Sequence, residues 1–468
     1  MFEDRDDAYD RLLDGLDRGR LNRLTFIRKA LALGIAAPAI SATLAQLPLT
    51  RGVEANAQKV AAATINYWSV VTQKTAFDQG EGPVIKLFEK AYPQIKVVVQ
   101  EIPFADYATK LSTAARAGTP PDVARVNHPD LQSYAGAGWL TPLDSYVASS
   151  KVIKPKDYFP GFYAITFFKG KQYALPVGTD NRCLYYNKRI FKEAGLVDKA
   201  GNPTPPKTWN DLVKASAQIK KRVKGVYPIA MAMGQPYGIS YQSFGNFMIT
   251  NDGYLLSRHG RPRAIAATDP ATAQAWKWFF GELYLKDQAF APGEVQIDGP
   301  AEQALFARGV AAMIHDGPWA KPELINPRMR FGPDYGMAGT PVRLPSQHAA
   351  ATQGGWLLGL FQASKNKAAG WAFIEFTQRP EINATWNSPE AFPPMDAGWK
   401  YKPFADNPFY RVYHAQLPYS RPPITPLVPQ TPEIAHELDV VGTKVMLGQM
   451  APGQGLRSFD DQANGTLR

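Results

Sequence analysis

The chain has a single cysteine, Cys183, among its 468 residues. One thiol excludes a disulfide within the chain and any metal site that is built on several cysteines. It also leaves no cysteine for lipid attachment directly after an export signal. A lone cysteine beside an expected strand is typical of a small, buried, apolar side chain.

The sequence also lacks the local signatures of catalysis and of cofactor binding. It has no Gly-x-Ser-x-Gly elbow, no His-Glu-x-x-His pair, no phosphate-cradling loop, no dinucleotide glycine motif and no calcium loop. The six histidines are far apart in sequence, and His315 and Asp316, as neighbours, are expected to point apart. We therefore expect no catalytic residue, no metal and no cofactor.

Long runs of one charge are missing as well. The net charge is +11, but no run of five or more basic residues occurs. Such a charge could attract nucleic acid, an anionic membrane or an acidic ligand. Because the basic residues are scattered, we interpret them as solvated surface and expect no nucleic-acid partner.

The N-terminal residues follow the order of an export signal. Basic residues at 23–29 precede an apolar stretch at 30–47, and Ala55-Asn-Ala57 forms a small-x-small site before Gln58. Pro38 interrupts the apolar stretch, which makes it a poor permanent membrane span, although a retained anchor is the alternative. The segment resembles a twin-arginine signal, with Arg23 present and Leu24 at the second arginine position. We expect residues 1–57 to be removed and the protein to be periplasmic or extracellular.

Strands and helices alternate along the remaining chain, which is long enough for two domains. This order favours an α/β fold with parallel, doubly wound sheets, in which ligands lie beyond the carboxyl ends of strands. In the first part those ends are Trp68–Thr72 and Asn127–Asp130. Hydrophobic periodicity predicts strands at 64–70, 95–100, 121–126, 310–314, 334–338 and 354–360, and helices at 83–91, 107–117, 131–138, 271–285, 301–308, 367–377 and 432–447.

One stretch, residues 172–211, carries the clearest local signals. Short strands are expected at 173–177 and 184–186. A helix should begin at Asn187 and end at Gly195, and Thr208 is a good N-cap for a helix over 209–219. The polar loop between the two strands holds Asp180 and Arg182.

Several sequence words in this chain resemble the extracellular solute-binding proteins of carbohydrate ABC importers, the maltose-binding-protein-like group. The words, in order, are Phe88-Glu-Lys-Ala-Tyr-Pro, Pro121-Asp-Val, Leu184-Tyr-Tyr-Asn-Lys with Pro206-Lys-Thr-Trp-Asn-Asp-Leu, Phe306-Ala-Arg-Gly-Val-Ala-Ala-Met with Gly317-Pro-Trp, and Gly354-Gly with Ser364-Lys-Asn. Each motif alone is a weak signal, but five motifs in the order found in the family, following an export signal, are specific for that family.

The resemblance implies a type II periplasmic-binding fold of two α/β lobes, joined by three chain crossings, with the ligand in the cleft. Lobe one would comprise residues 58–174 and 341–378, and lobe two residues 175–340 and 379–468. The implied function is non-enzymatic capture of a sugar or sugar-like polyol for the membrane permease subunits of an ABC importer, by a monomer.

Combined with strand-end geometry, the resemblance implies a ligand site made of loops from both lobes. Trp319 occupies the family's Gly-x-Trp position, where the ring stacks on the sugar, and Tyr237 and Trp356 are further aromatic candidates. Hydrogen bonds would come from polar side chains, and two glycines would let the backbone approach the ligand. The full set is Trp68, Asn127, Asp130, Asp180, Arg182, Tyr237, Asp316, Trp319, Gly354, Gly355 and Trp356.

Two other functions stay open from the sequence. The same receptor fold could bind an anionic ligand such as a glycerophosphodiester, as the net charge and Arg182 suggest. The second open function is that of a secreted enzyme acting on polysaccharide. The paired carboxylates of a glycosidase do not form a local sequence motif, so the lack of such a motif does not exclude this function.

Overall fold

The computed structural model describes residues 60–71, 74–388 and 390–468, together with a few single positions among residues 8–35. Residues 60–468 form one compact unit. The expected export signal, and Thr72 of the first strand-end loop, lie outside the described residues. In the part of the chain that is described, no helix is long and apolar enough to cross a membrane.

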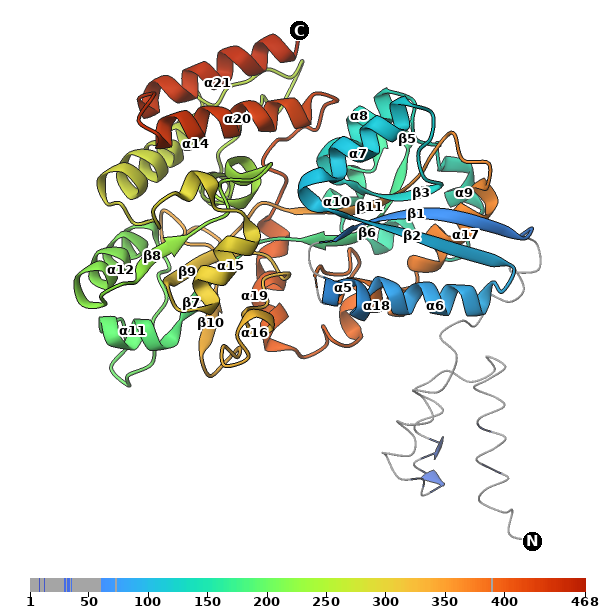
Figure 1. Ribbon diagram of the computed structural model, residues 1–468, viewed down its shortest axis with the longest axis horizontal. Helices are drawn as coiled ribbons and strands as arrows, with labels where there is room; N and C mark the ends of the chain where they lie inside the picture. Colours follow the sequence, from blue (N-terminus) through green and yellow to red (C-terminus); the bar gives the residue numbers. More distant parts are fainter. Residues whose placement is uncertain are drawn as a thin grey trace. The chain divides into compact units, whose positions relative to one another are not determined.

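Among the described residues, two larger β-sheets are each covered by helices (Figure 1), and a third sheet consists of only two short strands. The first sheet has five strands and the second has four. We call each of the two larger sheets with its covering helices a lobe. This arrangement confirms the predicted α/β fold of two lobes.

The first sheet is mixed rather than wholly parallel. Strands β1, β2 and β3 run parallel, as predicted, but β11 is antiparallel to both β3 and β6. The expectation of a parallel sheet failed here because β11 arrives from more than 200 residues away, and local periodicity does not fix strand direction. In spatial order the strands are β2 (Ile95–Pro103), β1 (Ala63–Val71), β3 (Val123–Asn127), β11 (Gly354–Leu360) and β6 (Ala174–Asp180).

Helices cover both faces of the first sheet (Figure 1). On one face α6 packs on α17 through Phe88, whose ring lies 5.1 Å from that of Phe373. Helix α7 covers the other face, where Tyr107 and Leu111 are buried. The helices and short strands of this lobe are α5 (Lys74–Gln79), α6 (Glu81–Ala91), α7 (Phe104–Arg116), the 3-10 turn η1 (His128–Asp130), α8 (Leu131–Gly136), α9 (Asp144–Ser149), η2 (Pro155–Asp157), α10 (Pro160–Ala164), β4 (Phe167–Phe168), β5 (Lys171–Gln172), α17 (Lys367–Thr377) and α18 (Pro380–Asn387).

Alternation along β7 divides the core of the second lobe into two clusters. Leu184 and Tyr186 face one cluster, whereas Cys183 and Tyr185 face the other. This is the period of two that a strand buried on both faces requires. It also confirms Cys183 as a buried apolar side chain. The strands, in spatial order, are β10 (Tyr335–Ala338), β7 (Cys183–Asn187), β9 (Ala311–Asp316) and β8 (Tyr227–Ala230).

Capping residues set the helix bounds of the second lobe as the sequence predicts. Asn187 caps α11 through a bond from the Ile190 amide, and Gly195 ends it in the left-handed region at φ 72°. Thr208 forms a reciprocal capping box with Asp211 at the start of α12. The helices are α11 (Lys188–Ala194), α12 (Trp209–Arg222), α13 (Phe244–Thr250), α14 (Pro270–Trp276), α15 (Gly299–Ala307), α16 (Pro322–Ile325), α19 (Pro408–Gln416), α20 (Thr431–Met446) and α21 (Pro452–Thr466), with the shorter segments η3 (Gly238–Gln242), η4 (Lys277–Lys286), η5 (Glu294–Gln296), η6 (Gly398–Lys400) and η7 (Leu417–Tyr419).

The helix expected over residues 271–285 changes its winding part-way. Helix α14 ends at Trp276 and continues as the π-helical segment η4. The aromatic side chains Trp276, Phe279 and Phe280 are all buried in the core of the second lobe. Hydrophobic periodicity therefore predicted a helix here, but not the wider π-helical turns of its second half.

The chain passes between the two sheets at identifiable points. It leaves the first sheet after β6 ends at Asp180, and it returns between β10 and β11. Helix α18 still belongs to the first lobe, since Asn383 and Asn387 each donate a hydrogen bond to the Val177 carbonyl. The following helix, α19, contributes Phe409 and Tyr413 to the second lobe.

Candidate ligand-binding cleft

A cavity of about 200 Å³ lies between elements of the two lobes. Helix α7, the end of β3, η1 and β11 supply its first wall. The loop after β8 and helix α20 supply the second. The lining residues are Phe104, Ala105, Tyr107, Ala108, Thr109, Asn127, Asp130, Pro236, Tyr237, Trp356, Pro432, His436 and Asp439.

Strand register creates the first wall. Asn127, the last residue of β3, stands opposite Trp356 on β11. The start of α7 places two more rings beside the indole, nearly at right angles to it. The ring centroid of Phe104 lies 6.3 Å from that of Trp356, and the Tyr107 centroid lies 5.9 Å from it. Edge-to-face packing of this kind holds apolar faces toward the space between the rings.

The second wall is a loop that α20 holds in place. Asp439 accepts hydrogen bonds from the amides of Ile239 at 3.1 Å and Ser240 at 2.9 Å, at the start of η3. Tyr237, just before η3, lies in the left-handed region at φ 63°. A bulky residue rarely adopts this conformation, which costs about 1–3 kcal/mol and is concentrated at functional sites.

One hydrogen bond joins the two walls. The Tyr237 hydroxyl donates to Asp130 Oδ1 at 3.0 Å. Asp130 is only 5% exposed. The pKa of its carboxyl is raised to about 7, mainly by burial; the bond from Tyr237 lowers the pKa and the charge of the nearby Glu433 raises it. Asp439 has its pKa raised to about 7 by desolvation as well.

A second group of predicted site residues lies where the chain crosses between the sheets. Asp180 and Arg182 form a buried ion pair, and each is at most 5% exposed. Arg182 also donates through Nε to Gln242 Oε1 at 3.0 Å. The guanidinium lies over the Trp319 ring, 4.9 Å from its centroid. Arg182 thus links the crossing strand to the predicted stacking tryptophan.

Trp319 and Asp316 are held by the same group. Asp316 accepts a bond from Gln303 Nε2 at 3.0 Å and another from the Gly317 amide at 2.8 Å. Burial raises its pKa to about 6, while bonds from Gly317, Gln303 and Trp319 lower it. His315 points away, with Nε2 2.9 Å from Thr340 Oγ1, as expected for neighbouring strand residues.

The two glycines and Trp68 have packing roles in this structure. A Cβ on Gly354 would come within 2.7 Å of Asp180 Oδ1, and a Cβ on Gly355 would overlap the Gly178 carbonyl. Gly355 also has φ 145°, which favours glycine. Trp68 packs in the core of the first lobe, and its carbonyl accepts a bond from the Tyr107 hydroxyl at 2.9 Å.

The structure therefore brings the predicted residues together in two groups. Asn127, Asp130, Tyr237 and Trp356 line the cavity, whereas Asp180, Arg182, Asp316, Trp319 and Gly354 contact one another beside the crossings. Four further lining residues were not predicted from the sequence: Phe104, Tyr107, His436 and Asp439. Nothing local marks them, because they begin or lie within ordinary amphipathic helices.

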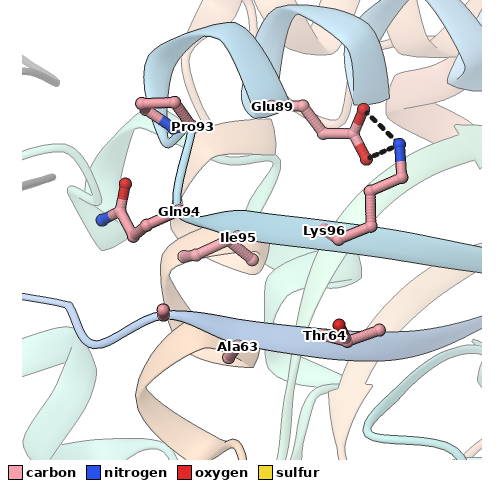
Figure 2. Close-up of a pocket in the computed structure, with 8 residues that line it drawn as sticks. Ala63, Thr64, Glu89, Pro93, Gln94, Ile95 and Lys96 are labelled. Atoms are coloured by element: carbon pink, nitrogen blue, oxygen red, sulfur yellow. Dashed lines mark hydrogen bonds and ion pairs between the residues drawn. The ribbon is translucent and has the colours of Figure 1, made fainter.

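A different hollow lies at the opposite end of the first sheet (Figure 2). Its residues begin strands β1 and β2, among them Thr64 and Lys96. Glu89 Oε1 lies 3.0 Å from Lys96 Nζ and accepts a bond from the Val97 amide at 3.0 Å. Since ligands of such sheets lie beyond the carboxyl ends of strands, we assign the site to the cavity beside Trp356.

Comparison with known proteins identifies the family of this chain. Residues 72–384, well over half of the chain, match the family described as bacterial extracellular solute-binding protein. The chain belongs to this family. As a solute-binding protein it is a member of a group that is defined by binding, which supports the expectation that it is not an enzyme.

Solved structures share the two-lobe architecture of this solute-binding protein. A binding protein of Thermotoga lettingae bound to α-D-tagatose is 26% identical, with a TM-score of 0.75 over 87% of this chain and 100% of that one. The sugar-binding protein MalE of Xanthomonas citri is 27% identical, with a TM-score of 0.70 over 86% and 97%. A maltotriose-binding protein of Pyrococcus abyssi is 28% identical over 62% of this chain and 57% of its own length.

Proposed function

We propose that this solute-binding protein captures a small sugar or polyol in the cavity lined by Trp356 and Tyr237 and presents it to the membrane subunits of an ABC importer. The observation that carries the proposal is the cavity itself, which has apolar ring faces beside hydrogen-bonding groups and is formed by both lobes. Sugars offer flat apolar faces and many hydroxyls, so they need this combination.

The size of the cavity supports a ligand with one sugar ring or a short polyol chain. Its volume of about 200 Å³ is below the roughly 300–1,000 Å³ of sites for drug-sized molecules. The similar Thermotoga lettingae protein holds a single-ring sugar, tagatose.

The lining argues against an anionic ligand. Asp130 and Asp439 are part of the lining, and no lysine or arginine is among the cavity residues that the structure describes. Arg182 is already paired with Asp180. A phosphodiester would therefore meet negative rather than positive charge in this cavity.

A polysaccharide-active enzyme would need one carboxyl as acid and a second, free carboxylate as its partner. Among the described lining residues, the acids are Asp130 and Asp439. Asp439 Oδ1 is occupied by the amides of Ile239 and Ser240, so it positions the loop. Simple binding needs only one acceptor, which Asp130 provides.

We also propose that the lobes close around the ligand, as in other two-lobe receptors. The bond between Tyr237 and Asp130 supports closure because it spans the cavity. We propose lobe boundaries that follow sheet membership, so that the first passage follows Asp180 rather than residue 174, and α18 belongs to lobe one rather than lobe two. Export by the N-terminal signal and a monomeric state complete the proposal.

A thermal-shift screen of the purified protein tests the proposed function. Sugars and polyols should raise the melting temperature, because a ligand that binds only the folded state stabilises it. Glycerophosphodiesters should not. If only the phosphodiesters stabilise the protein, the proposed ligand class is wrong.

A further inference from the structure

The charge of the cavity contrasts with the charge of the chain. The chain carries +11, yet the described lining includes two carboxylates and no lysine or arginine. Two acids elsewhere in the protein, Glu81 and Asp180, each have an arginine as a direct partner. Among the residues that the structure describes, no arginine forms an ion pair with Asp130.

The groups that act directly on Asp130 are an acid and a phenol, whereas Arg125, which lies 4.5 Å from the centroid of the Trp356 ring, is paired with Glu81. Glu433 and Tyr237 both affect the pKa of Asp130. In turn, the charge of Asp130 helps to raise the pKa of the Tyr134 and Tyr107 hydroxyls, so both phenols lie near this carboxylate. Asp439 and His436 line the same cavity, and His436 is exposed at its mouth. The hydrogen bond that Asp130 accepts from protein comes from the neutral Tyr237 hydroxyl.

Four aromatic side chains complete the lining beside this carboxylate. Phe104 and Tyr107 stand nearly perpendicular to Trp356, at 89° and 85°, and Tyr237 closes the space from the other lobe. The faces of aromatic rings carry negative potential, and they attract cations, above all when water is excluded. Rings at right angles with an adjacent carboxylate are the chemistry that recognises an ammonium group.

We propose that the preferred ligand is a small sugar or polyol that carries a positively charged amine, with the ammonium group held between Asp130 and the surrounding rings. This inference rests on the proposed function and narrows its ligand class. The amine donates a charge-assisted hydrogen bond to Asp130, while the remaining hydroxyls are left for Asn127 and the other polar groups of the lining.

The test compares ligands that differ only in the amine. Calorimetry with the purified full chain would use 1-amino-1-deoxysorbitol against sorbitol, and glucosamine, galactosamine and mannosamine against glucose, galactose and mannose. We expect at least one amine to bind about tenfold or more tightly than its hydroxyl counterpart. Counterparts that bind equally or more tightly than their amines overturn this inference and leave the proposed function standing.

Variants identify the group responsible. Asp130→Asn should remove the preference for the amine while the hydroxyl counterpart still binds. Glu433→Gln removes the same charge from an exposed position on α20 next to Asp130, so the preference should remain. A preference that survives Asp130→Asn, or that Glu433→Gln abolishes, contradicts the assignment to Asp130. If neither set of compounds binds and no other sugar or polyol does, the proposed function itself fails.

Discussion

The Tyr237 hydroxyl donates a hydrogen bond to Asp130 Oδ1 across 3.0 Å, joining two residues that are 107 positions apart in the chain. Asp130 follows a strand of the first sheet, and Tyr237 follows a strand of the second. Both line the same cavity. The contact therefore connects ligand binding to the approach of the two lobes.

Removing the Tyr237 hydroxyl should weaken ligand binding. Tyr237→Phe keeps the ring but leaves Asp130 without its donor, and a bond to a charged group contributes about 1.5–3 kcal/mol. We expect the dissociation constant to rise roughly tenfold to a hundredfold. Calorimetry measures the affinity, and X-ray scattering should show a smaller decrease in the radius of gyration on ligand addition than in the wild type.

The matched control is Tyr241→Phe, four residues further on. The Tyr241 hydroxyl is buried and has no hydrogen-bond partner among the described residues. Its removal should leave the affinity almost unchanged. Equal losses in both variants would mean that the Tyr237–Asp130 bond has no special role.

The pH dependence of stability should differ between the wild type and Asp130→Asn. The folded protein raises the pKa of Asp130 from 3.8 to about 7, so the folded state binds the proton more tightly than the unfolded state. The stability that this group contributes is complete below pH 4 and is lost as the pH rises through 7, with a slope of at most about 1.4 kcal/mol per pH unit.

Urea denaturation at several pH values between 5 and 8 measures this effect. Because asparagine does not titrate, the variant should gain stability relative to the wild type as the pH rises. The pKa of Asp439 is raised in the same direction, but Asp439 is present in both proteins. The difference in stability between the two proteins therefore reports on Asp130 alone. Parallel stability curves would contradict the raised pKa.

The buried ion pair at the crossing should matter far more than an exposed pair. Asp180→Asn leaves Arg182 buried without its counter-charge, which costs about 3–5 kcal/mol of unfolding free energy. The control is Glu193→Gln, which breaks the ion pair with Arg189. In that pair the Arg189 side chain is 62% exposed and the Glu193 side chain is 44% exposed. This substitution should cost no more than about 1 kcal/mol. Equal losses in the two variants by chemical denaturation would contradict this account.

Local signals predicted most of the elements and their ends. The cap of α12 at Thr208 and the stop of α11 at Gly195 follow from residues within one turn of the helix end. Likewise, the pattern over residues 367–377 gave the bounds of α17 as they are observed. These features depend on neighbours in sequence, so one sequence contains enough information for them.

The features that the sequence did not yield depend on distant residues. Strand β11 makes the first sheet mixed, and its pairing partners β3 and β6 lie far away in the chain. Asp439 reaches the cavity from a helix near the C-terminus, and its role in holding η3 has no local mark. Arg182 was expected to bind hydroxyls, but its contacts with Asp180 and Trp319 require three segments to meet.

Export should yield a shortened protein. The basic, apolar and small-x-small segments predict cleavage near Gln58 when the full gene is expressed in a bacterium with a suitable export pathway. Mass spectrometry of the periplasmic or secreted fraction measures the new N-terminus. Recovery of the full 468-residue chain from the cytosol alone would contradict the prediction.

The central claim is that the ligand lies in the cavity beside Trp356, and calorimetry of tryptophan variants tests it most directly. With a ligand from the thermal-shift screen, Trp356→Ala should raise the dissociation constant about thirtyfold, since a buried aromatic anchor contributes about 2 kcal/mol. Trp319→Ala should lower the affinity less, because Trp319 is not among the residues that line the cavity. Trp371→Ala, whose ring packs on Tyr146 outside the cavity lining, should have no effect. If the alanine variant fails to fold, Trp356→Leu can replace it, because leucine keeps apolar volume beside Phe104 and Tyr107. Wild-type affinity in a folded Trp356 variant would contradict the claim that the ligand lies in this cavity.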